Sequence, residues 1–163
     1  MGYDPGSYGG VIGALNTAEP AVRTPYSPYS RIHYISEHQH SVAECYPTLA
    51  DGVVLTCGIA APWTLGALVE VIPASTITDT FDVHYIGVES LSANAVYEIF
   101  LYCGASDDLC GHVRVTKNAV QDGTRNVAFM SPLIPANSRI RAAVASDTGA
   151  ANTATISLFY HAY

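Results

Sequence analysis

Apolar and polar residues alternate with a period of two along most of the chain after residue 50. This period is typical of β-strands with one buried face, because successive side chains of a strand point to opposite sides. The stretch 153–161 shows it most clearly. Its alternate positions predicted to face inward are Ala154, Ile156, Leu158 and Tyr160, and those predicted to face outward are Thr153, Thr155, Ser157 and His161.

Further strand-like segments precede this one, and Gly, Asp, Asn or Pro residues separate them. They are 53–57, 66–72, 81–88, 95–103, 111–116, 125–130 and 138–145. Within 81–88, we expect Phe81, Val83 and Tyr85 to share one face. No segment requires a long helix, and the βαβ rhythm is missing. The sequence therefore predicts an all-β fold, an antiparallel sandwich of jelly-roll type, with a small closed barrel as the alternative.

The first fifty residues have a different composition, rich in glycine, proline and tyrosine. Only 31–36 alternates enough to suggest a strand there. We therefore divide the chain into an extended N-terminal arm at 1–50 and a β-sandwich domain at 51–163. Proline favours extended backbone, and tyrosine offers contact area at low entropic cost, so we expect the arm to bind a partner, with a solvated tail as the alternative. The candidate partner-binding residues are Tyr3, Tyr8, Tyr26, Tyr29 and Tyr34.

The overall charge limits the kinds of partner. The chain carries 7 Lys+Arg against 14 Asp+Glu, a formal net charge of −7, and charged residues make up 13% of it. Phosphate contacts need clustered positive charge, so we expect no nucleic-acid partner. No apolar run reaches the roughly 18 residues of a membrane span, and the start lacks a signal-peptide pattern, so we also expect no membrane partner and no export signal.

The four cysteines are Cys45, Cys57, Cys103 and Cys110. The last two are close enough to face each other across a hairpin, but without a secretion signal we expect free, buried thiols. The absence of a C-x₂-C pair argues against a zinc site.

Two histidine groups are candidates for metal binding. His38 and His40 would project to one side of an extended segment, near Glu44, but they lack a well-spaced third ligand, so we expect hydrogen-bonding roles.

His84, His112 and His161 fall on different strands and would meet only if the fold brought them together, as in a cupin-like metalloenzyme. We expect dispersed surface histidines instead, and the Asp107-Asp108 pair to form a solvated turn rather than a calcium site.

No recognised nucleophile elbow, phosphate loop or dinucleotide fingerprint is present. We therefore expect neither an enzyme nor a cofactor. Arg139 and Arg141 lie two residues apart on one face of a strand, where their guanidinium groups suit carboxylates of another subunit. Ordinary surface salt bridges are the alternative.

Two segments near the C-terminus, 131–142 and 152–161, resemble the closing two strands of small β-sandwich virion proteins of tailed bacteriophages. The Ile134-Pro135-Ala136-Asn137 turn and the terminal Tyr160-His161 carry most of the likeness. These proteins look like capsid decoration, or cement, proteins, which sit as trimers on the outer head surface and clamp neighbouring capsomers. The family has no short functional motif, so no residue here inherits a role from it.

The resemblance implies a non-enzymatic homotrimer that binds the major capsid protein on the outer head surface of a virion, after synthesis in the host bacterial cytoplasm. The alternative is a tail-associated or fibre-tip module that binds host-surface carbohydrate through Trp63, Tyr85 or Tyr102.

Overall fold

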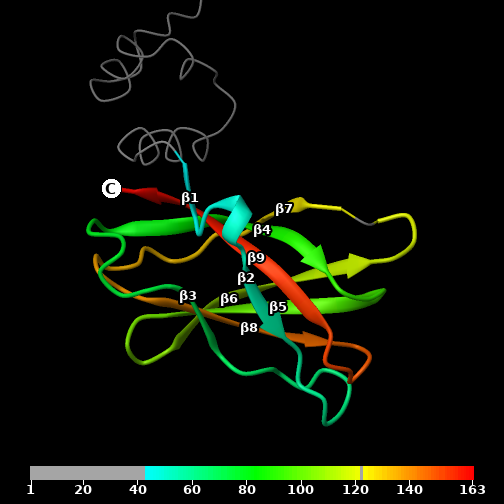
Figure 1. Ribbon diagram of the computed structural model, residues 1–163. Coiled ribbons are helices and arrows are strands. Elements are labelled where there is room, and N and C mark those ends of the chain that lie inside the picture. Colours follow the sequence, from blue (N-terminus) through cyan, green and yellow to red (C-terminus); the bar gives the residue numbers. More distant parts are fainter. Residues whose placement is uncertain (1–42, 122) are drawn as a thin grey trace, which may run out of the picture. The chain divides into compact units, whose positions relative to one another are not determined.

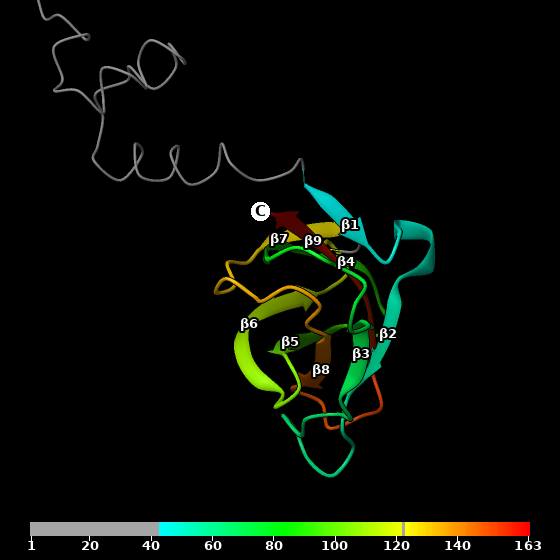
Figure 2. The same ribbon diagram turned by 90° about the vertical axis from the view of Figure 1, so that its left-hand side faces the viewer.

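The computed structural model describes residues 43–121 and 123–163, which form two antiparallel β-sheets (Figure 1). The first sheet contains β1 (Glu44–Tyr46), β2 (Val53–Thr56), β4 (Phe81–Leu91), β7 (Arg125–Ala128) and β9 (Thr153–Ala162). The second contains β3 (Val69–Ile72), β5 (Ala95–Cys103), β6 (Asp108–Lys117) and β8 (Ile140–Ser146). Turned by 90°, the domain shows β4, β7 and β9 together on one side and β5, β6 and β8 on the other (Figure 2).

The strand order identifies a jelly roll. The first sheet runs β1-β9-β4-β7, with β2 also pairing with β9, and the second runs β3-β8-β5-β6. The pairs β2–β9, β3–β8, β4–β7 and β5–β6 are all present and antiparallel. The first half of the domain therefore pairs in reverse order with the second half, as in a long hairpin folded into two sheets. This confirms the predicted all-β sandwich of jelly-roll type. Because the strands form two separate sheets, the alternative of a small closed barrel is wrong.

The strands lie close to their predicted positions, and β5 coincides with the predicted 95–103. The structure adds a short strand that was not predicted. β1 pairs with the end of β9 through Glu44↔Tyr160, so the sandwich already includes residues that the sequence analysis assigned to the arm at 1–50. The five arm tyrosines, the 31–36 segment and the His38/His40 pair lie outside the described residues.

The core fills the space between the sheets, and its inward faces follow the predicted period. Ala154, Ile156 and Leu158 of β9 have no exposed surface, and neither do Tyr97 and Ile99 of β5. The Tyr97 hydroxyl donates to the Ala93 carbonyl oxygen at 2.8 Å and accepts from the Ala93 amide at 3.1 Å. The largest buried side chain therefore keeps its polar atom hydrogen-bonded, which avoids the cost of a buried unpaired hydroxyl.

The prediction that Tyr85 shares a face with Phe81 and Val83 is wrong. Phe81 and Val83 are fully buried, whereas Tyr85 is 43% exposed. The pairing of β4 with β9 shifts register between Val83 and Tyr85. Such an irregularity adds a residue to one strand and reverses the alternation beyond it, so Ile86 and Val88 take the inward positions instead.

The expectation of free thiols is wrong for one pair of cysteines. Cys103 and Cys110 form a disulfide across the β5–β6 hairpin, with their Cα atoms 6.0 Å apart. Cys57 is free and buried, and Cys45 is free and half-buried. Burial raises the pKa of both free thiols, which keeps them in the less reactive neutral form.

The described residues contain one short 3-10 helix, Leu49–Asp51. Within the same part of the chain, no helix is long and apolar enough to cross a membrane.

Candidate interaction surface

An apolar groove of about 280 Å³ lies between the β5–β6 turn and the connection from β7 to β8. Leu109, Leu133, Pro135 and the Cys103–Cys110 disulfide contribute to its lining. Leu133 is 62% exposed and Leu109 is 56% exposed. Two large exposed aliphatic side chains beside a concave apolar surface are the kind of feature that a protein partner covers.

Backbone and side-chain hydrogen bonds fix one wall of the apolar groove to the sandwich. Ile134 exchanges two backbone hydrogen bonds with Phe81, at 2.7 and 3.0 Å. The Ser131 hydroxyl accepts from the Val83 amide at 2.9 Å. Asn137 adopts φ 63°, a left-handed conformation that asparagine tolerates well, and its amide donates to the Ile77 carbonyl. Leu133 is therefore presented by a segment anchored on both sides.

Arg139 directly follows Ser138 of the groove lining, and both Arg139 and Arg141 bind a carboxylate of their own chain. Asp107 accepts from Arg139 Nη2 at 3.1 Å and from Arg141 Nη1 at 2.8 Å. Each guanidinium group also donates to backbone carbonyls, Arg139 to that of Gly104 and Arg141 to that of Leu68. Asp107 is thus an ion-pair acceptor rather than the solvated turn residue we expected. The part of the two arginines in a subunit interface stays a prediction.

The outer face of the second sheet carries a chain of polar and aromatic contacts. Glu98 accepts from Arg114 at 2.6 Å and lies 2.7 Å from His112 Nδ1. The Arg114 hydrogen bond, aided by His112, lowers the pKa of Glu98 despite the opposing effect of burial. The Arg114 guanidinium also lies 4.8 Å from the centre of the Trp63 ring. A cation–π contact with the ion-paired Arg114 therefore covers one face of the Trp63 ring.

The aromatic residues considered for carbohydrate binding are distributed over the domain. Trp63 lies in the connection between β2 and β3, Tyr85 lies on β4 of the first sheet, and Tyr102 lies on β5 of the second. No contact between any two of these three rings is among the ring contacts of the described residues, so each would have to stack on a sugar by itself.

The histidines are partly dispersed and partly clustered. His112 lies on β6 and stacks on Phe100 with ring centres 5.4 Å apart. His84 and His161, by contrast, come together on the first sheet, with ring centres 4.2 Å apart. The expectation of dispersed histidines therefore fails for this pair. The two rings meet because β4 pairs with β9, and the prediction of individual strands does not say which strands pair.

Sequence reasoning missed the apolar groove. Leu133 stands between two prolines in a connection, and Leu109 falls between the predicted strands 95–103 and 111–116, where the structure begins β6 earlier than expected. One signal for the groove was available in the sequence. A large aliphatic residue in a segment without a strand or helix period has no regular core face to occupy, which indicates an exposed apolar position.

No protein-family model matches the chain, and no curated protein matches it. Among solved structures, it is similar to the VP2 subviral particle of infectious bursal disease virus. That likeness has 14% identity and a TM-score of 0.41 and covers 76% of this chain and 34% of the other. The Gt strain structure of the same virus gives 12% identity, a TM-score of 0.37, and coverages of 74% and 32%. The chain spans about a third of these proteins' length. Likenesses this weak carry no argument here, and the jelly-roll assignment rests on the strand pairings.

Proposed function

We propose that this protein is a structural virion protein that decorates and stabilises a phage head. In this proposal it is a homotrimer on the outer surface of the capsid, where it binds the major capsid protein across neighbouring subunits. The body is the jelly roll, and the N-terminal arm supplies the second contact with the lattice.

The observation that carries the proposal is the anchored apolar groove in the segment that resembles phage virion proteins. Leu133 and Pro135 belong to both the resemblance and the groove. The jelly roll by itself is shared by capsid proteins, lectins and cupins, so the fold is support by analogy only. A rigid body with exposed aliphatic side chains supports a role in protein contact.

The arm adds a physical reason for lattice binding. An extended segment spends conformational entropy when it binds, but it covers a broad surface and can cross a joint between neighbours. Many copies act on one lattice, so modest affinity at each contact accumulates through effective concentration. The body and the arm together would then resist separation of capsomers better than either contact alone.

Carbohydrate recognition is the second candidate, because Trp63 remains 43% exposed on its loop. Binding on a glycan array that is lost in a Trp63→Ala variant, together with no binding to heads, would favour this candidate over decoration.

The direct experiment is co-sedimentation with heads purified from a mutant of the source phage that lacks this chain. The full-length protein should sediment with the heads and saturate at a fixed number of copies. A variant lacking residues 1–30 should fold, as judged by circular dichroism and thermal unfolding, and should no longer bind.

Light scattering of the free protein measures its oligomeric state, and we expect the mass of three chains. Failure of the full-length protein to bind heads would refute the proposal. Full retention of binding by the truncated variant would remove the arm from the mechanism.

A further inference from the structure

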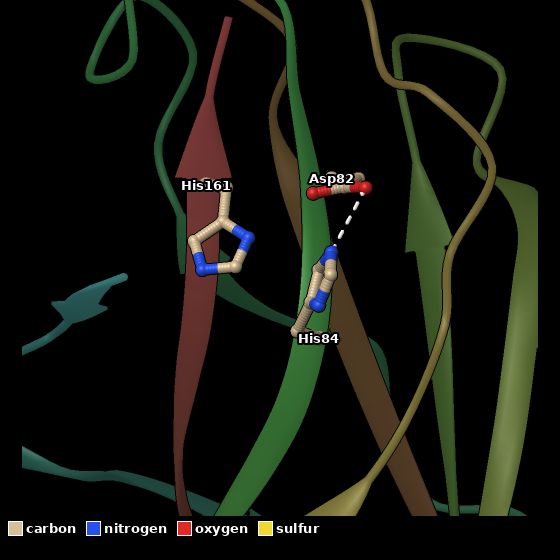
Figure 3. A group of neighbouring side chains, drawn as sticks. All are labelled: Asp82, His84 and His161. Atoms are coloured by element: carbon tan, nitrogen blue, oxygen red, sulfur yellow. Dashed lines mark hydrogen bonds and ion pairs between the residues drawn. The ribbon is translucent and has the colours of Figure 1, made fainter. Parts of the chain in front are cut away.

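Three potential metal ligands meet on the outer face of the first sheet (Figure 3). Asp82 and His84 occupy alternate positions of β4, next to the inward-facing Phe81 and Val83. His161 lies on β9, directly opposite Asp82 in the strand register. The pairing of the two strands thus places all three side chains on one side, where Figure 3 shows a ring nitrogen of His161 turned toward the other two.

The distances suit a single small ion. His84 Nε2 and Asp82 Oδ2 are 3.1 Å apart, and one ligand atom from each of the three residues lies within 4.8 Å of the others. Ligands at about 2.0–2.1 Å from a tetrahedral ion are separated by about 3.3 Å. The Asp82–His84 pair already has nearly this separation, and a modest rotation of the His161 side chain would bring in the third ligand.

Asp82 provides an independent sign that a cation belongs here. Its Oδ2 atom accepts from the Tyr163 hydroxyl at 2.8 Å and contacts His84. Its Oδ1 atom is buried and has no hydrogen-bond partner among the described residues. An unpaired buried carboxylate oxygen is costly, and a bound cation would remove that cost. The Tyr163 hydrogen bond would orient the carboxylate in the way that outer partners of metal ligands do.

We propose that Asp82, His84 and His161 bind one divalent transition-metal ion, with Zn²⁺ as the expected ion. Two imidazoles and one carboxylate match zinc chemistry, and they leave one tetrahedral position for water or a further ligand. The ion links β4 to β9, the two central strands of the first sheet. It therefore fastens the C-terminal end of β9 to the sandwich, and this inference does not depend on the proposed role in a virion.

The test uses the full-length protein, freed of metal with a chelator and then dialysed. Titration with Zn²⁺, followed by calorimetry, should show one high-affinity ion per chain. Co²⁺ in place of Zn²⁺ should give the visible absorption of a tetrahedral site. Saturating Zn²⁺ should raise the midpoint of thermal unfolding.

Variants assign the ion to these residues. His84→Ala and His161→Gln should each weaken Zn²⁺ binding at least about tenfold, and Asp82→Asn should do the same while preserving the shape of the side chain. His112→Ala is the matched control, because His112 lies on the other sheet and is paired with Glu98; it should bind Zn²⁺ like the unmodified protein. Thermal unfolding without metal identifies any variant that fails to fold, and Asp82→Asn then serves as the deciding variant.

A second control addresses the histidines of the arm. The double variant H38A/H40A should keep the site. The proposal is overturned if the folded protein binds no stoichiometric Zn²⁺, if Asp82→Asn binds as tightly as the unmodified protein, or if H38A/H40A alone abolishes binding.

Discussion

Tyr160 illustrates how one buried hydroxyl makes stability depend on pH. Burial, and then the 2.7 Å hydrogen bond from its hydroxyl to the Glu44 carboxylate, raises the pKa of Tyr160 to about 12. An unfolded tyrosine has a pKa of about 10. Between these values the unfolded chain releases the proton while the folded chain keeps it. The group therefore stabilises the fold fully below pH 10, and this contribution is lost as the pH rises toward 12.

We expect Tyr160→Phe to flatten the fall in stability above pH 10. Urea unfolding at pH 9 and pH 11 should show that the unmodified protein loses about 1 kcal/mol more than the variant over this interval. Equal losses in the two proteins would contradict the assignment of the raised pKa to Tyr160.

Gly111 occupies a position where a side chain does not fit. Its φ is 151°, and a Cβ atom would lie 2.8 Å from the Phe129 ring. We expect Gly111→Ala to lower the free energy of unfolding by about 1–3 kcal/mol, because the ring must move and the backbone must change. Gly123→Ala is the control, since a Cβ there meets nothing within 4 Å. Chemical denaturation that ranks the two variants equally would contradict this explanation.

The β5–β6 hairpin is held by a covalent bond as well as by its ladder. The disulfide joins residues seven apart, and a short closed loop of this kind contributes about 2 kcal/mol, mainly by restricting the unfolded chain. We expect the double substitution C103S/C110S to lower the free energy of unfolding by this amount in urea.

A thiol titration in denaturant offers an independent check. Of the four cysteines, only Cys45 and Cys57 are free, so the unmodified protein should show two reactive thiols per chain. Four reactive thiols, or a double variant of unchanged stability, would show that the bond does not form.

The strands were predictable because their period of two is a local property; the burial pattern of β5 shows it, and that of β9 departs from it at Ser157, which has no exposed surface. Three features were not predictable, each because it depends on pairing between distant segments. The register shift after Val83 reversed the expected side of Tyr85. The same β4–β9 pairing brought His161 beside Asp82. The apolar groove depends on the β7–β8 connection lying against the β5–β6 turn.

If the apolar groove is a contact surface, a charged side chain in it should weaken assembly or head binding. Leu133→Asp places a charge on a side chain that is already 62% exposed, so the stability of the isolated protein should change by less than about 0.5 kcal/mol. Head binding or trimer formation should weaken at least about tenfold, because a charge would be buried in the contact. Val120→Asp, at a position that is 92% exposed, should leave both unchanged. Normal assembly and head binding by Leu133→Asp would show that the groove is not a contact surface.

In the proposed role, the apolar groove and the tyrosine-rich arm attach the jelly-roll body to a capsid lattice. Electron cryo-microscopy of heads lacking the protein, imaged before and after its addition, tests this most directly. We expect added density on the outer surface that fits three sandwiches around a threefold position and extends onto neighbouring capsomers. Heads that show no added density at saturating protein concentration would contradict it.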